Sequence, residues 1–194
     1  MTSHRRLPLG QLFVIGFDGT RVPQASARLI AEQQLGGVIL FKRNIESLEQ
    51  VVALNTELFE LGKAAAFPVI VSVDQEGGRV ARLRGIMSDV PSMRAVGAAA
   101  EHDAEVPYRL GAMMARELSA LGFHWDFAPV VDVDTNPQNP VIGERSFARD
   151  PQVVARLGAR FIEGMQGAGV AASATHFPGH GDTDVDSHHA LPRL

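Results

Sequence analysis

The chain has 194 residues, of which 45% are hydrophobic and 21% are charged, and its formal net charge is −4. This composition is typical of a globular protein with a sizeable core. No basic run extends beyond Arg5 and Arg6, which argues against nucleic acid and against a membrane surface as partners. The absence of cysteine excludes a disulfide framework and a thiolate metal site, and it fits a cytoplasmic protein. No apolar stretch approaches the roughly 20 residues that a bilayer crossing requires.

The N-terminal segment has two interpretations. Arg5 and Arg6 precede an apolar run over residues 7–15, which is the order found in a signal peptide. However, proline, glycine and glutamine interrupt this run, and no small-x-small cleavage site follows it. We therefore favour a first strand of the domain over a signal peptide.

Strands and helices are expected to alternate along the rest of the chain. The expected strands are 11–17, 38–41, 68–73, 123–133 and 169–174, and the expected helices are 22–35, 45–63, 107–121 and 151–165. Asn44 is the expected N-cap of the second helix, and a long loop is expected over residues 74–91. The repeated order predicts parallel βαβ units of an α/β protein rather than a sandwich or a bundle. A Rossmann fold is not expected, because no strand is followed by G-x-G-x-x-G.

Polar residues follow the third predicted strand. Asp74 stands at its end, and the loop that follows contains Gly77, Gly78 and several arginines. Carboxylate and guanidinium groups form hydrogen bonds suited to sugar hydroxyls, and glycines allow the backbone to pass close to a ligand. A tight polar turn with solvated charges is the competing interpretation.

The segment 132–147 has part of the spacing of a calcium-binding loop. Asp132, Asp134 and Asn136 have the first three spacings of an EF-hand loop. Pro137 then stands where glycine is needed, and Gly143 stands where the bidentate glutamate should be. We reject a calcium site for this reason.

A loop rich in histidine and aspartate follows the last predicted strand. Its sequence over residues 175–188 is T-H-F-P-G-H-G-D-T-D-V-D-S-H. Asp186 and His188 are close enough to pair, and histidine is suited to proton transfer near neutral pH. A zinc site is the alternative, for which the acceptable ligands are His176, His180, Asp182, Asp186 and His188. The spacing of the first two histidines, across proline and glycine, does not follow the helical H-E-x-x-H pattern.

Three of these segments resemble one enzyme family. The histidine loop is similar to the K-H-F-P-G-H-G-D-T-x-x-D-S-H signature of family 3 glycoside hydrolases, in particular the bacterial β-N-acetylglucosaminidases of the NagZ type. Residues 74–80 match the family's D-Q-E-G-G-R-V, and residues 140–147 resemble P-V-I-G-D-R-S-F, with Glu144 in place of aspartate. The resemblance covers essentially the whole chain. It implies a (β/α)8 TIM barrel, of which residues 1–194 hold about the first five βα units, so we expect a partial catalytic barrel domain.

The resemblance also implies a chemistry. It is that of a retaining exo-β-N-acetylglucosaminidase, which removes terminal N-acetylglucosamine from muropeptides in cytoplasmic peptidoglycan recycling and needs no cofactor. His188 is implied as the general acid and then the general base, with Asp186 as its partner. The implied nucleophile is an aspartate that the family carries downstream of this loop, outside the present chain. The implied sugar-binding residues are Asp74, Arg82, Arg145, Thr175 and His176.

Several alternatives stay open beside this prediction. Arg145 also fits a salt-bridged loop arginine, and Thr175 replaces the family's lysine, which removes a charge and shortens the reach of the side chain. A non-catalytic sugar-binding remnant without the nucleophile is the main competing function. A metal-dependent hydrolase ranks below it, because the resemblance favours acid–base chemistry over a metal site.

Overall fold

A parallel sheet forms the centre of the computed structural model, which describes residues 9–65 and 67–192. Its strands are β1 (Val14–Ile15), β2 (Gly37–Leu40), β3 (Ile70–Val73), β6 (Trp125–Asp126) and β7 (Ala171–Ala172). They lie in the order β1-β2-β3-β6-β7, and every neighbouring pair is parallel. Each strand therefore pairs with the strand of the same sheet that follows it along the chain, as consecutive βα units do. The predicted α/β fold with five parallel strands is confirmed.

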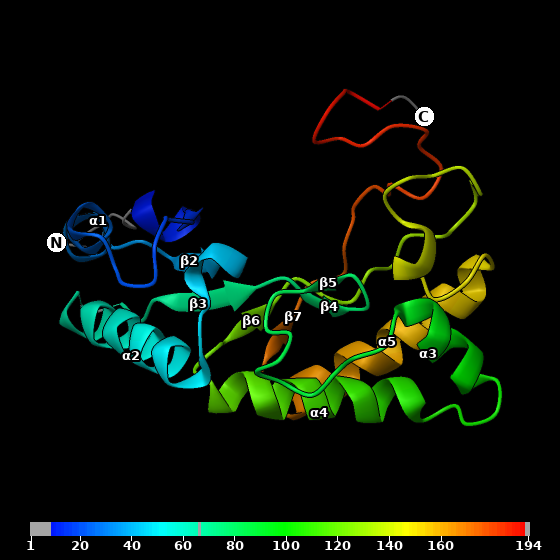
Figure 1. The fold of residues 1–194 in the computed structure, drawn as a ribbon, viewed down its shortest axis with the longest axis horizontal. Helices are drawn as coiled ribbons and strands as arrows, with labels where there is room; N and C mark the ends of the chain where they lie inside the picture. The colour runs from blue at the N-terminus through cyan, green and yellow to red at the C-terminus, as the bar shows by residue number, and fades with distance from the viewer. Residues whose placement is uncertain (1–8, 66, 193–194) are drawn as a thin grey trace, which may run out of the picture.

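Five α-helices accompany the sheet within the described residues: α1 (Gln24–Gln33), α2 (Leu48–Ala64), α3 (Met93–Ala100), α4 (Val106–Ala120) and α5 (Pro151–Gly167). In Figure 1, α2, α4 and α5 lie below the sheet, and α4 packs along α5. Phe123, Phe161 and Leu118 are among the largest fully buried side chains of the core. None of the helices in the described ranges has the length and apolar character needed to span a membrane.

The beginning of the chain differs from the expectation. Arg5 and Arg6 lie outside the described residues. Residues Leu9–Leu12 form a 3-10 turn, and the strand that follows, β1, is much shorter than the predicted 11–17.

The predicted cap at Asn44 is wrong. Helix α2 begins at Leu48, and the Ser47 hydroxyl accepts a hydrogen bond from the Gln50 amide at 3.2 Å. Asn44 is buried instead, and its side chain donates to the carbonyls of Phe17 (3.0 Å) and Gly19 (2.7 Å). Its amide therefore fixes the chain that leaves β1, rather than the start of a helix.

The segment between β3 and α4 holds more structure than the predicted loop. Strands β4 (Gln75–Gly77) and β5 (Val80–Ala81) form an antiparallel pair directly after β3. Helix α3, which was not predicted, follows with Ser92 as its N-cap. The hairpin holds the polar residues after Asp74 close to the end of β3.

Glycines allow α4 and α5 to approach each other closely. A Cβ atom on Gly111 would lie 2.3 Å from the carbonyl oxygen of Phe161, and one on Gly164 would lie 2.1 Å from that of Tyr108. Such distances are far below any van der Waals contact, so a side chain at either position forces the two helix backbones apart.

We expect Gly164→Ala to lower the free energy of unfolding by about 1–3 kcal/mol, because overpacking at a backbone contact cannot relax within one side chain. Gly167→Ala is the matched control on the same helix, since the nearest atom to its Cβ is 3.8 Å away. The control is expected to change stability by no more than about 1 kcal/mol. Urea denaturation of both variants checks this, and equal losses would contradict the close approach.

Candidate active site

The predicted functional segments meet at the carboxyl ends of β3, β6 and β7. Asp74 follows β3 directly, residues 127–135 follow β6, and residues 173–188 follow β7. A bridge between Val130 and Thr175 extends the pairing of the last two segments beyond the strands. The carboxyl ends of parallel strands face one edge of the sheet, which is where barrel enzymes carry their chemistry.

Arg145 and Glu76 form a buried ion pair at this edge. The Arg145 Nε and Nη2 atoms each donate to one Glu76 oxygen at 2.7 Å. Their side chains are only 11% and 6% exposed. Burial lowers the pKa of Arg145, but the hydrogen bonds and charge of Glu76, with further contributions from Asp132 and Asp74, raise it overall. The guanidinium is therefore a fixed positive charge.

His176 lies between this ion pair and Asp132. Its Nδ1 atom is 2.6 Å from Asp132 Oδ2, and its Nε2 atom is 3.4 Å from Arg145 Nη2. The backbone amides of His176 and His180 also donate to the Asp132 carboxylate. Burial raises the pKa of Asp132, but these hydrogen bonds outweigh it and hold the pKa below its usual value. The structure thus brings together two of the predicted residues, Arg145 and His176, and adds Glu76 and Asp132.

Asp74 and Arg82 form a second, looser pair. Arg82 Nη2 is 3.4 Å from Asp74 Oδ2, and both side chains are partly exposed. The negative charge of Asp74 also contributes to the raised pKa of Arg145, so the Asp74–Arg82 pair and the Arg145–Glu76 pair share one electrostatic environment.

Thr175 is half-buried, directly before His176. Its backbone amide donates to the Pro129 carbonyl at 3.1 Å. Its hydroxyl is buried and finds no hydrogen-bond partner among the described residues. A threonine hydroxyl offers neither the charge nor the length of the lysine that the family has at this position.

Asp186 and His188 pair with each other on the exposed part of the loop. Asp186 Oδ1 accepts from the His188 amide at 2.9 Å and lies 2.7 Å from its Nδ1 atom. These hydrogen bonds, first from the amide and then from the ring, lower the pKa of Asp186. The His188 side chain is 82% exposed. Within the described residues, no hydrogen bond or ion pair joins this pair to Asp74, Arg82, Arg145 or His176, and in Figure 1 the chain beyond His180 extends away from the sheet.

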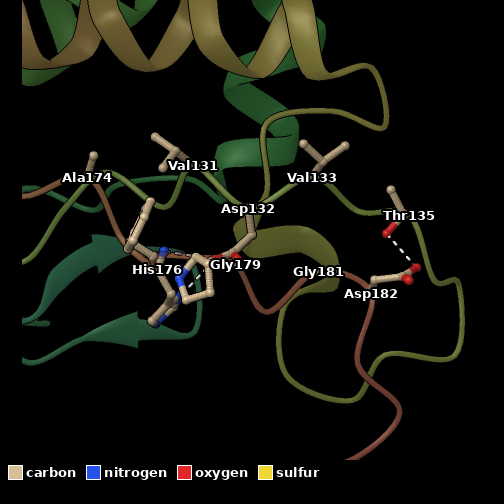
Figure 2. Close-up of a pocket in the computed structure, with 11 residues that line it drawn as sticks. Val131, Asp132, Val133, Thr135, Ala174, His176, Gly179, Gly181 and Asp182 are labelled. Atoms are coloured by element: carbon tan, nitrogen blue, oxygen red, sulfur yellow. Dashed lines mark hydrogen bonds and ion pairs between the residues drawn. The ribbon is translucent and has the colours of Figure 1, made fainter. Parts of the chain in front are cut away.

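A pocket of about 380 Å³ lies between the segments that leave β6 and β7. Figure 2 shows Asp132 and His176 side by side on one wall, with Gly179 next to them and Asp182 bonded to Thr135 farther along. The described residues contain no group of three or more histidine, cysteine or acidic side chains placed to share a metal ion. The predicted zinc ligands thus do not assemble in this structure.

Asp126 is a buried acid that the sequence did not single out. It is 0% exposed, and its Oδ1 atom accepts from the Gln75 amide at 2.9 Å, between Asp74 and Glu76. Its Oδ2 atom has no partner among the described residues. Burial, together with the nearby charges of Asp74 and Glu76, raises the pKa of Asp126 well above its ordinary value. In the sequence this residue is hidden inside an apolar strand.

We expect Asp126→Asn to make stability less dependent on pH. The folded chain holds the Asp126 proton more tightly than the unfolded chain, because burial raises its pKa. Its contribution is therefore fully present below the unfolded pKa and is lost as the pH rises through the folded pKa. An asparagine can still accept from the Gln75 amide but never ionises. The variant should gain stability relative to the wild type as the pH rises from about 4 to 8, and urea denaturation giving a constant difference would contradict this.

Comparisons with known proteins identify the family of the chain. The family model described as the glycosyl hydrolase family 3 N-terminal domain matches residues 6–194. A β-hexosaminidase of Idiomarina loihiensis is 41% identical over 181 residues, which are 92% of this chain and 53% of that protein. The structure of a family 3 β-N-acetylglucosaminidase from Paenibacillus sp. str. FPU-7 is 46% identical with a TM-score of 0.90, over 95% of this chain and 35% of that one.

The structure of native NagZ from Neisseria gonorrhoeae is 35% identical with a TM-score of 0.83, over 92% of this chain and 52% of that one. The chain thus spans about half, or less, of the length of these relatives. The open sheet of five parallel strands corresponds to the first part of their barrel-type fold, as predicted. The chain belongs to glycosyl hydrolase family 3, and it carries part of the family's N-terminal domain.

Proposed function

We propose that this chain is the sugar-binding and proton-transferring part of a retaining exo-β-N-acetylglucosaminidase. The observation that supports it most is the network Glu76–Arg145–His176–Asp132, which links the ends of β3, β6 and β7. A fixed guanidinium beside an imidazole offers a hydrogen-bond donor next to a group that can also accept, as the hydroxyls of a sugar require.

The sugar is proposed to bind through Asp74, Arg82, Arg145, Thr175 and His176. Charged groups hydrogen-bond to hydroxyls about twice as strongly as neutral ones. The side chains of Asp74, Arg82 and His176 are between 23% and 38% exposed, so they remain open to a ligand while their backbone is held by the strand ends.

His188 is proposed to exchange the proton, with Asp186 as its partner. An ionised carboxylate only accepts, so Nδ1 of His188 carries a hydrogen and Nε2 is the atom that gives a proton to the leaving sugar oxygen. The same atom then takes a proton from the water that attacks the glycosyl-enzyme. Asp186 orients the ring and stabilises its charged form. The carboxylate nucleophile of the retaining mechanism is proposed to come from sequence downstream of residue 194.

The proposed substrate is a muropeptide that carries a terminal β-linked N-acetylglucosamine, and the proposed setting is peptidoglycan recycling in the cytoplasm. The support for the N-acetyl sugar is the histidine loop and the names of the relatives, which include β-hexosaminidase and β-N-acetylglucosaminidase. No cofactor is part of this proposal.

The test is the turnover of two chromogenic substrates by the complete barrel protein, meaning this chain together with the downstream sequence that supplies the nucleophile. We expect the β-N-acetylglucosaminide to be hydrolysed about tenfold or more faster than the β-glucoside, as a site built for the acetamido group would require. A chelator is expected to leave the rate unchanged. Faster hydrolysis of the β-glucoside would contradict the proposed N-acetylglucosamine substrate. Sugar binding without any product would favour a non-catalytic sugar-binding protein.

A further inference from the structure

Both carboxylate oxygens of Asp132 are occupied by donors from the histidine loop. Oδ2 faces Nδ1 of His176 at 2.6 Å and its backbone amide at 3.2 Å, and Oδ1 accepts from the amide of His180. The Asp132 side chain is 0% exposed, so water does not compete for these bonds. The hydrogen bonds from the two histidines hold the pKa of Asp132 below its usual value, against the effect of burial. An ionised carboxylate only accepts, so Nδ1 of His176 must carry a hydrogen.

The other ring nitrogen of His176 faces a group that can only donate. Nη2 of Arg145 lies 3.4 Å from Nε2 of His176, and a guanidinium has no acceptor. Arg145 cannot turn away without breaking its two 2.7 Å bonds to Glu76. A hydrogen on Nε2 would point at these donors, so Nε2 carries a lone pair.

We infer that Asp132 is a positioning residue, which fixes His176 as the neutral tautomer with its hydrogen on Nδ1 and the lone pair of Nε2 turned toward the guanidinium of Arg145. The His176 side chain is 38% exposed, so part of the ring remains accessible to a ligand. Figure 2 shows Asp132 and His176 together on the wall of the pocket. This inference deepens the proposed function, on which it rests, because it says how the ring of His176 and the guanidinium of Arg145 are held together at the proposed sugar site.

The geometry explains why a carboxylate is needed and an amide is not equivalent. Asparagine at position 132 would offer one acceptor and one donor in place of two acceptors. If its oxygen faced His176, its NH2 group would point at the amide of His180; if it were flipped, the NH2 group would face Nδ1 of His176. The flipped amide donates to Nδ1 and moves the ring hydrogen to Nε2.

The test is a long-range proton–nitrogen NMR spectrum of the 194-residue chain labelled with 15N-histidine, recorded at about pH 8, where free imidazole is neutral. The signals of His176 are those missing from the His176→Gln variant. We expect a protonated Nδ1 and an unprotonated Nε2 in the wild type, and a loss of this pattern in Asp132→Asn. Asp184→Asn is the matched control, since it removes the same charge from an exposed position on the same loop. It should leave the pattern unchanged.

A wild-type spectrum with the hydrogen of His176 on Nε2 would overturn the inference, and so would an unchanged pattern in Asp132→Asn. If circular dichroism shows that Asp132→Asn is unfolded, the wild-type NMR spectrum by itself tests the inference. Calorimetry with N-acetylglucosamine adds a second measurement, in which Asp132→Asn is expected to weaken binding about threefold to tenfold, the worth of one neutral hydrogen bond. The NMR spectrum is recorded without sugar. The inference about the tautomer can therefore be contradicted while the proposed sugar binding holds, and the reverse is also possible.

Discussion

Replacing Arg145 by alanine is expected to destabilise the chain by about 3–5 kcal/mol, because it leaves the carboxylate of Glu76 buried without its partner. The pair is almost inaccessible, with side chains 11% and 6% exposed, so water cannot replace the guanidinium. The variant should also lose its affinity for the sugar, since the same guanidinium faces His176. Urea denaturation measures the first effect and calorimetry the second.

Arg149→Ala is the matched control for this prediction. Arg149 lies four residues after Arg145 and is also in an ion pair, 3.2 Å from Asp134, but its side chain is 64% exposed. Asp134 keeps a second partner in Arg94 at 2.7 Å. The control should therefore cost no more than about 1 kcal/mol. Equal losses in the two variants would contradict a special role for the buried pair.

Replacing His188 by alanine in the complete barrel protein is expected to lower kcat by about 10²- to 10⁴-fold, which is the usual contribution of a general acid–base group. The fold should be unaffected, because the side chain is 82% exposed. Initial rates with a chromogenic β-N-acetylglucosaminide measure the effect.

His189→Ala is the neighbouring control, because His189 is also an exposed histidine on the same loop and is not part of the proposed dyad. It should retain most of the wild-type rate. A His188→Ala variant as active as this control would remove the dyad from the mechanism.

Local patterns in the sequence predicted the main sheet and the places of the site residues. The five parallel strands, and helices α1, α2, α4 and α5, follow from apolar runs and from helical spacing. Asp74 and His176 were expected directly after predicted strands, and they follow β3 and β7. The wrong assignment of Asn44 has a clear cause, because its side chain bonds to a segment more than 20 residues away rather than to the helix beside it.

The partners of these residues could not be predicted in the same way. Glu76 is 69 positions from Arg145, and Asp132 is 44 positions from His176. Each lies inside a segment that had been singled out, but periodicity says nothing about contacts across such separations. Arg145 shows that sequence patterns do not predict contacts between distant residues, because the sequence left a choice between a sugar contact and a salt bridge for this side chain. In the structure the salt bridge to Glu76 is what holds the guanidinium beside His176.

The most direct test of a sugar site at these strand ends is a calorimetric titration of the folded 194-residue chain with N-acetylglucosamine, with glucose as the competitor sugar. The network of Glu76, Arg145, His176 and Asp132 predicts saturable binding of N-acetylglucosamine, weaker binding of glucose, and loss of the heat in Arg145→Ala. A folded wild-type chain that gives no binding heat, or heat that Arg145→Ala leaves unchanged, would contradict it.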